Sequence, residues 1–284
     1  MLDKNQSKLL QRALREITGI PLAIDGKLGE SSLKALQRCS EMLGITPVPN
    51  AFEGEGFDLV MAYISLRFVS EEAFGQAASK LQVDEPSVRS IAEVETRQSG
   101  YLPDGRLSIL FERHWFYKKL KDSLKDKKMQ QHVAATLGVD LSKHTEATLL
   151  QLVCQKHPDI CSASSGGYKG GAAEWERLMT AAMYSPEAAY ASASYGSFQI
   201  MGFNYALCGY TSPMEMVKDF ARSESAQFLG VCSFIKANPQ IHKALKAKNW
   251  AAFASGYNGE DYRKNKYDEK LNQAYAKWAA ELKK

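Results

Sequence analysis

Cysteine and histidine are scarce in this chain, and neither is grouped. The five histidines do not cluster, and no Cys-x-x-Cys pair occurs. The cysteines are odd in number and widely scattered: Cys39, Cys154, Cys161, Cys208 and Cys232. A zinc site or a disulfide framework needs such residues at short, regular spacings. We therefore expect free thiols, no metal site and no other cofactor.

Long apolar runs are also missing. No uninterrupted apolar stretch is long enough to cross a bilayer, so we expect no stable membrane insertion. Residues 1–8 lead into an amphipathic pattern and lack the apolar core and cleavage site of a secretory signal. If the protein acts outside the cytoplasm, something else must release it.

Positive charges exceed negative charges only slightly, giving a net charge of +4. An excess this small fits a polyanionic target but does not demand one. The Gly-rich stretch 162–171 lacks the Gly-Lys-Ser/Thr ending of a phosphate-binding loop, so it indicates no nucleotide site. We expect no nucleic-acid partner.

Helical periodicity dominates what is present. The 284 residues are enough for one large or two ordinary domains, and 45% apolar residues are typical of a globular protein. Apolar residues recur at helical spacing through most of the chain, without strand–helix alternation. Residues 107–111 form a short apolar run that indicates a strand. We predict a mainly α fold.

Residues 1–46 show two helical stripes around a loop. Asp25-Gly26 indicates a tight turn, and Gly29 gives a second bend before the next helix begins. A Gln-x-x-Leu helix, Asp-Gly-x-x-Gly and a helix with Ala-Leu follow in order, which resembles the small peptidoglycan-binding repeat of cell-wall enzymes. The resemblance implies a wall-binding role for Asp25, Gly26 and Gly29. A generic helical bundle with a tight turn is the alternative.

The stretch 46–56 is rich in proline and glycine and is the best candidate linker. The apolar residues 57–68 form a helix that could complete the first domain or begin the second. We therefore predict a peptidoglycan-binding domain over residues 1–65, with its boundary within 47–69, and a second domain over residues 70–284.

One helix carries a carboxylate where a core residue is expected. Asp84 can cap its N-terminus, and the helix is expected to end near Gln98 and Ser99, before Gly100. Its apolar face is formed by residues at i, i+3, i+4 and i+7: Val88, Ile91, Ala92 and Glu95. Glu93 points to nearly the opposite side. Because Glu95 and not Glu93 lies on the apolar face, we predict that Glu95 is the acid that faces a cleft.

A carboxyl group on an apolar face costs free energy unless it is paired or keeps its proton. A protonated carboxylic acid is the general acid that glycosidic bond cleavage requires. The alternative is a structural ion pair between Glu95 and an arginine such as Arg113.

Two later stretches carry groups suited to sugars, residues 193–202 and 254–262. Gln199 and Asn258 offer amide donors and acceptors for sugar hydroxyls and N-acetyl groups. Gly196 would allow a close backbone approach. Flat aromatic faces for pyranose rings are offered by Tyr195, Tyr257 and Tyr262. Taken singly, each stretch is better explained as a turn or a core aromatic, and only their joint presence with Glu95 favours a sugar site.

The order of these stretches resembles a known superfamily. A helix ending in Val-Glu-Thr precedes Ser-Tyr-Gly-Ser-Phe-Gln-Ile-Met, and Tyr-Asn-Gly comes last. This is similar to the goose-type lysozymes and lytic transglycosylases. The resemblance is closest to the N-acetylmuramidase domain of bacteriophage endolysins, with its Leu-Phe-Glu-Arg-His stretch, and covers roughly residues 70–284. With the N-terminal repeat, the chain resembles a modular endolysin of a phage that infects Gram-negative bacteria.

The resemblance implies a lysozyme-like α domain with minor β structure behind the small wall-binding domain. It implies a glycoside hydrolase that cuts the β-1,4 bond between N-acetylmuramic acid and N-acetylglucosamine in peptidoglycan. Glu95 would be catalytic. The substrate-binding residues would be Tyr195, Gly196, Ser197, Gln199, Tyr257, Asn258 and Tyr262. We expect a monomer, made in the host cytoplasm, that reaches periplasmic peptidoglycan after holin-type release and lyses the host.

A second catalytic carboxylate is less easily found. Asp104 follows Glu95 by nine residues, but its Pro-Asp-Gly setting also explains it as a turn residue. Glu112 follows the expected strand and either lines the cleft or pairs with Arg113 outside it. Relatives in this superfamily often depend on one glutamate alone, so neither residue is required.

Two other functions stay open. In a lytic transglycosylase Glu95 would act as acid and base while the muramyl 6-hydroxyl attacks, but the Gly-Leu-Met-Gln form is replaced here by Gly-Ser-Phe-Gln. A wall-binding protein without activity would have no reason to keep a costly acid on an apolar stripe.

Overall fold

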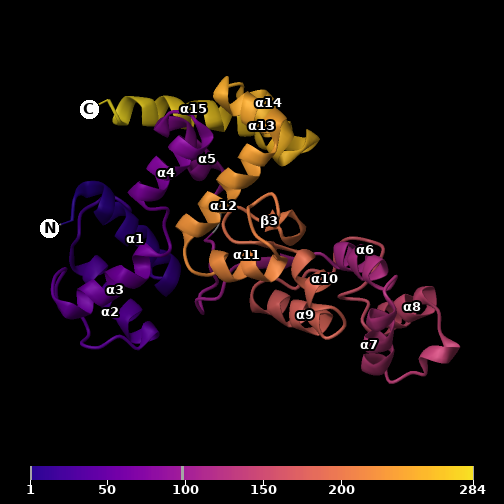
Figure 1. The fold of residues 1–284 in the computed structure, drawn as a ribbon. Coiled ribbons are helices and arrows are strands. Elements are labelled where there is room, and N and C mark those ends of the chain that lie inside the picture. The colour runs from indigo at the N-terminus through magenta and orange to yellow at the C-terminus, as the bar shows by residue number, and fades with distance from the viewer. Residues whose placement is uncertain (1, 97–98, 284) are drawn as a thin grey trace.

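The computed structural model describes residues 2–96 and 99–283, and helices make up most of these ranges (Figure 1). In chain order the helices are α1 (Lys4–Thr18), α2 (Glu30–Leu43), α3 (Glu55–Ser65), α4 (Glu71–Leu81), α5 (Glu85–Glu95), α6 (Arg113–Ser123), α7 (Lys127–Leu137), α8 (Glu146–Lys156), α9 (Ala172–Ala182), α10 (Pro186–Ala191), α11 (Pro213–Phe220), α12 (Glu224–Ala237), α13 (Pro239–Lys246), α14 (Trp250–Asn258) and α15 (Tyr267–Glu281). The prediction of a mainly α fold is confirmed. Within the described ranges, no helix is both long and apolar enough to cross a membrane.

The hydrophobic side chains gather into two separate cores. The first joins α1, α2 and α3 through residues such as Leu10, Leu36 and Val60, each 0% exposed. The second extends through the later helices from α4 to α15. Because Phe57, Val60 and Ile64 of α3 pack into the first core, this helix completes the first unit.

The Pro/Gly-rich stretch 46–56 is not the connection between the two cores, so this prediction is wrong. The stretch joins α2 to α3 within the first unit, and Gly56 lies so close to Pro47 that a Cβ atom would be 2.0 Å from the Pro47 carbonyl oxygen. Residues 66–70 link the two cores instead. The start of α12 holds this link, because Glu224 N donates to Leu66 O (2.8 Å) and Ser70 N donates to Ser225 Oγ (3.0 Å).

The signature residues of the N-terminal repeat hold its own turn together. Gln11 Nε2 donates to Asp25 Oδ1 (3.0 Å), and Gly26 N donates to Gln11 Oε1 (2.8 Å). Gly26 has φ +80°, and a Cβ atom there would be 2.9 Å from the Lys4 carbonyl oxygen. Gly29 precedes α2 as its N-cap. These residues therefore shape the α1–α2 connection.

A small antiparallel sheet lies in the middle of the second unit. It has the order β1 (Ile109–Phe111), β2 (Ala193–Tyr195) and β3 (Ile200–Met201), with Leu110 opposite Ser194 and Tyr195 opposite Ile200. The expected strand is thus present. The β2–β3 turn presents residues 196–199, and the chain after β1 reaches Glu112 at once.

Helix α5 is shorter than predicted. Asp84 caps it by accepting from Ser87 N (3.3 Å), as expected, but the helix ends at Glu95 with Thr96 as C-cap rather than near Ser99. Gln98 lies outside the described residues. Helix α15 packs along α5 (Figure 1). Glu95, which was expected in the final turn, is therefore the last residue of the helix.

Candidate active site

Glu95 ends the apolar stripe of α5. Val88 and Ile91 are 0% exposed and Ala92 is 6% exposed, whereas Glu95 is partly exposed. Glu93 points to the other side, where its Oε2 accepts from Lys277 Nζ (2.9 Å) and Trp278 Nε1 (2.8 Å) of α15. The two acids of this helix therefore face different surroundings, as the stripe predicts.

The end of α14 brings an amide to Glu95. Asn258 Nδ2 donates to Glu95 Oε1 at 3.0 Å, across 163 residues of sequence. This contact joins the first and last of the three stretches. The Arg113 guanidinium instead donates to the carbonyl oxygens of Pro158 (3.1 Å), Ser164 (3.0 Å) and Ser165 (2.8 Å), which argues against an ion pair with Glu95.

Tyr257 precedes Asn258 in α14, and its ring packs against another aromatic side chain. The ring stacks on Phe253 with centroids 5.7 Å apart and an interplanar angle of 8°. Its hydroxyl is buried and has no hydrogen-bond partner among the described residues. Burial, and then the nearby Glu95 carboxyl group, raise the pKa of Tyr257 well above its usual value. Tyr257 therefore packs beside the acid, with one face of its ring on Phe253.

Gln199 closes the β2–β3 turn with its own amide. It adopts φ +49°, and its Nε2 donates to Gly196 O (2.8 Å) while Oε1 accepts from Ser194 Oγ (2.7 Å). A positive φ at a non-glycine residue is uncommon and often marks a functional turn. The side chain remains exposed at the surface of the hairpin.

Three residues predicted to bind substrate have little or no exposed surface. Tyr195 is 0% exposed and donates its hydroxyl to Tyr190 O (2.8 Å). Tyr262 is 7% exposed, and Ser197, at 5%, donates its hydroxyl to Glu224. Of the three, Ser197 faces the core because the hairpin packs against the start of α12.

Gly196 is required where the hairpin meets α12. Its φ is +71°, and a Cβ atom would lie 2.2 Å from Gln227 Oε1. That oxygen also accepts from Ser197 N (2.9 Å). The glycine therefore allows the hairpin to approach the buried amide of α12.

Glu224 is a buried acid that sequence reasoning did not find. It is 8% exposed and accepts from Ser197 Oγ and from Gly100 N (3.2 Å). It thereby ties the hairpin to the loop that follows Glu95. Burial raises its pKa to about 7. In the sequence it reads as an ordinary acid in a first helical turn behind the capping Ser223, so its burial gave no signal.

The raised pKa of Glu224 predicts that stability falls as pH rises. The folded chain keeps this proton up to about pH 7, whereas the unfolded chain releases it near the ordinary glutamate pKa of 4.5. The free energy of unfolding should therefore fall by ~3 kcal/mol between these limits. Denaturant titrations of the wild type and Glu224→Gln at about pH 5 and about pH 8 measure this. Glu224→Gln should reduce the pH dependence, and equal dependence in both proteins would contradict the assignment.

Glu112 lies directly after β1. Its carboxylate accepts from the Tyr168 hydroxyl (2.9 Å to Oε2), and His114 Nδ1 lies 3.2 Å from the same oxygen. Its side chain is 15% exposed. The Glu112 carboxylate therefore contacts Tyr168 and His114 instead of forming the ion pair with Arg113 that was one of its two predicted roles. Through Tyr168 it holds the loop before α9 against the sheet.

Asp104 belongs to its own turn. Its carboxylate accepts from Arg106 N (3.1 Å) and Arg106 Nε (2.9 Å), and the Arg106 side chain holds the pKa of Asp104 below its usual value. The residue is exposed. The turn interpretation therefore accounts for Asp104. Among the described residues, no group of three or more His, Cys, Asp and Glu side chains could hold a metal ion.

A helical unit with an acid at a helix end, a short hairpin and a second helix that touches the acid defines a lysozyme-like protein. Residues 84–279 match the N-acetylmuramidase family model. This is more than half of the chain, so the chain belongs to the N-acetylmuramidase family and is a glycoside hydrolase that acts on peptidoglycan.

A solved structure supports the same placement over the whole length. The crystal structure of the Burkholderia AP3 phage endolysin is similar at 30% sequence identity and a TM-score of 0.64. The match covers 96% of this chain and 95% of the endolysin. The resemblance to a phage endolysin with a muramidase domain is thus confirmed. A search of the curated proteins finds no match.

Proposed function

We propose that Glu95 is the general acid that protonates the β-1,4 glycosidic oxygen between N-acetylmuramic acid and N-acetylglucosamine. The observation that carries this is the contact between Asn258 Nδ2 and Glu95 Oε1, 3.0 Å, at the partly exposed end of an apolar stripe. An acid in such a position can give its proton to a leaving oxygen within hydrogen-bond reach. Asn258 fixes the orientation of the carboxyl group.

The hairpin supplies the opposite wall of the proposed groove. Gly100, five residues after Glu95, is so close to Ser197 that a Cβ atom would lie 2.6 Å from the Ser197 hydroxyl oxygen. Gln199 follows two residues later with an exposed side chain. We infer that Gln199 and Asn258 face the glycan, while Tyr195, Ser197, Tyr257 and Tyr262 support these two from behind.

Glu112 is our candidate for the second carboxylate. Its carboxylate is mostly buried at the end of β1 and is oriented by Tyr168. It would activate water or stabilise the developing positive charge on the sugar. Asp104 is bound to Arg106 in an exposed turn and is the weaker candidate.

Loss of the Asn258 amide should weaken turnover without unfolding the protein. Asn258→Ala leaves Glu95 without one donor, a loss that costs ~1–3 kcal/mol and reduces the rate about tenfold or more. The rate of peptidoglycan solubilisation measures this, with circular dichroism as the check on folding. Tyr275→Phe is the control, because its hydroxyl binds Asp84 Oδ2 (2.9 Å) at the other end of α5. Equal rates for Asn258→Ala and the wild type would count against the site.

The biological role we propose is host lysis by a monomeric phage endolysin. It would be made in the host cytoplasm and reach the peptidoglycan of the periplasm after holin-type release. A simple test is to add the protein to Gram-negative cells with a permeabilised outer membrane and to follow the turbidity of the suspension. A fall in turbidity is expected, and binding of cell walls without any fall would overturn this role.

The first unit should bind peptidoglycan by itself. Residues 1–65 contain α1, α2 and α3 with their own core, and tethering would raise the local concentration of the second unit at the wall. The fragment 1–65 should sediment with purified sacculi, while the fragment 66–284 should stay active but bind more weakly. If 1–65 remains in the supernatant like an unrelated helical protein of similar charge, the binding role is refuted.

A further inference from the structure

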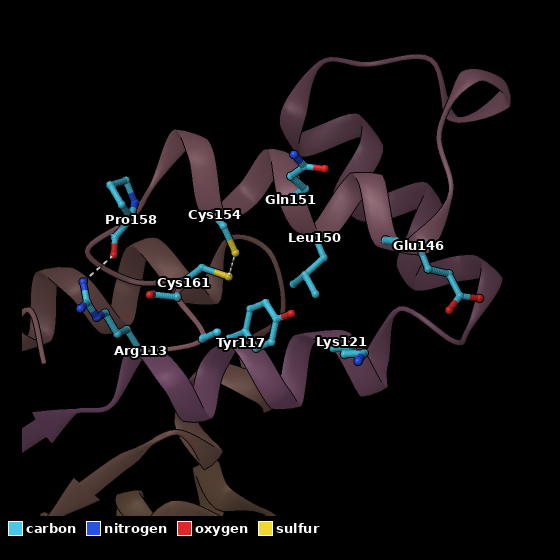
Figure 2. A pocket seen from close by; sticks show the side chains of 12 residues that line it. Arg113, Tyr117, Lys121, Glu146, Leu150, Gln151, Cys154, Pro158 and Cys161 are labelled. Carbon is cyan, nitrogen blue, oxygen red and sulfur yellow. Dashed lines mark hydrogen bonds between the residues drawn. The ribbon is translucent and has the colours of Figure 1, made fainter. Parts of the chain in front are cut away.

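Two cysteines meet at the base of the loop that joins α8 to α9. Cys154 lies in the last turn of α8, and Cys161 follows seven residues later. Their sulfur atoms are 2.8 Å apart, and Figure 2 shows the two side chains pointing toward each other. Both are free thiols in this structure. The remaining cysteines lie inside the two cores with exposures of 0–4%: Cys39, Cys208 and Cys232.

We propose that Cys154 and Cys161 form an intramolecular disulfide when the protein meets a disulfide oxidant. The co-reactant is a small-molecule disulfide, such as oxidised glutathione, or a protein that carries an exchangeable disulfide. The proposal stands independently of the chemistry assigned to Glu95, because it concerns a different part of the second unit.

Of the two cysteines, only Cys154 is accessible to solvent to a significant extent. A hollow of about 520 Å³ between α6, α8 and the following loop is lined by both cysteines, together with Arg113, Tyr117 and Leu150 (Figure 2). Cys154 is partly exposed in this hollow, whereas Cys161 is 1% exposed. An incoming disulfide therefore reaches Cys154 first, and Cys161 stands behind it as the resolving thiol.

The close contact between the sulfur atoms supports this order. It lowers the pKa of Cys154, whereas the same contact and burial raise the pKa of Cys161. The thiolate is the attacking species in thiol–disulfide exchange. Of the two thiols, the accessible one is thus also the one that ionises more readily.

The exchange balances in two steps. The Cys154 thiolate attacks one sulfur of the oxidant, forming a mixed disulfide and releasing the other half as a thiolate that takes up the proton from Cys154. Cys161 then loses its proton, and its sulfur attacks the Cys154 sulfur and displaces the second half as a thiol. Two protein thiols are oxidised by two electrons, and one external disulfide is reduced to two thiols.

The bond would secure a loop that already carries several contacts. Arg113 binds the carbonyl oxygens of Pro158, Ser164 and Ser165, and Tyr168 donates to Glu112 at the sheet. Linking Cys161 to α8 restrains the unfolded chain at the base of this loop. The oxidised protein should therefore unfold at a temperature about 5 °C higher than the reduced protein.

Peptide mapping of the full-length protein tests the proposal directly. Lys156 separates the two cysteines, so trypsin divides them into the peptides 144–156 and 157–169. After treatment with oxidised glutathione and alkylation of free thiols, these peptides should appear as one cross-linked species that reductant separates. Cys39, Cys208 and Cys232 should be alkylated only after unfolding. Cys161→Ser should instead retain glutathione on Cys154 and show no rise in melting temperature.

Two results would overturn the proposal. One is recovery of both peptides singly alkylated after oxidation of the folded protein. The other is a melting temperature that rises equally on oxidation of the wild type and of Cys161→Ser, because that rise cannot come from this bond.

Discussion

Glu95→Gln should abolish lysis while leaving the protein folded. Glutamine keeps the size of the side chain and can accept the hydrogen bond from Asn258, but it has no proton to give to the glycosidic oxygen. Loss of one general acid costs about 10²–10⁴ in rate. The rate of release of soluble muropeptides from purified peptidoglycan measures the effect.

Glu93→Gln is the matched control for this substitution. It lies two residues away on the same helix, and its carboxylate binds Lys277 and Trp278 rather than Asn258. It should keep most of the activity. A folded Glu95→Gln protein with wild-type activity, or equal losses in both variants, would remove Glu95 from the mechanism.

Arg177→Met should destabilise the second unit strongly. Arg177 (1% exposed) and Glu174 (0% exposed) form a buried ion pair with Nη1–Oε2 2.6 Å apart. Glu174 also accepts from Phe111 N (3.0 Å), and Arg177 donates to Phe111 O (2.9 Å), so the pair holds β1 to α9. Removing one partner leaves a buried charge uncompensated, which costs ~3–5 kcal/mol.

The fall in stability should appear as a drop in melting temperature of about 10 °C or more. Lys34→Met is the control, because Lys34 pairs with Glu30 on the surface of α2, where the side chains are 69% and 81% exposed. An exposed pair of this kind contributes ~0–1 kcal/mol. If the two variants melt at the same temperature, the buried pair does not hold β1 as described.

The parts of the site that follow a local pattern could be predicted from the sequence. The separation of Glu93 from Glu95 follows from helical spacing, because residues two positions apart lie on nearly opposite faces. The capping of α5 by Asp84 follows from residue type and position. The closeness of Asn258 to Glu95 did not follow from spacing. Only the family resemblance implies it, because it makes Glu95 catalytic and Asn258 substrate-binding.

The parts that depend on packing between distant segments could not be predicted. Tyr195 looks like a sugar platform in the sequence, but β2 is buried on both faces, so its ring belongs to the core. Glu224 and Gln227 meet the hairpin from α12, about thirty residues further along the chain. Whether a polar side chain binds substrate or satisfies such a buried contact depends on long-range packing, which periodicity does not encode.

Mass spectrometry of the glycan fragments tests the central claim most directly. Purified peptidoglycan is digested with the wild-type protein and with Glu95→Gln, and the ends of the released fragments are identified. We predict reducing N-acetylmuramic acid ends from the wild type and no new ends from Glu95→Gln. Anhydro ends would show transglycosylation instead of hydrolysis, and reducing N-acetylglucosamine ends, or unchanged glycan, would contradict the proposed cleavage altogether.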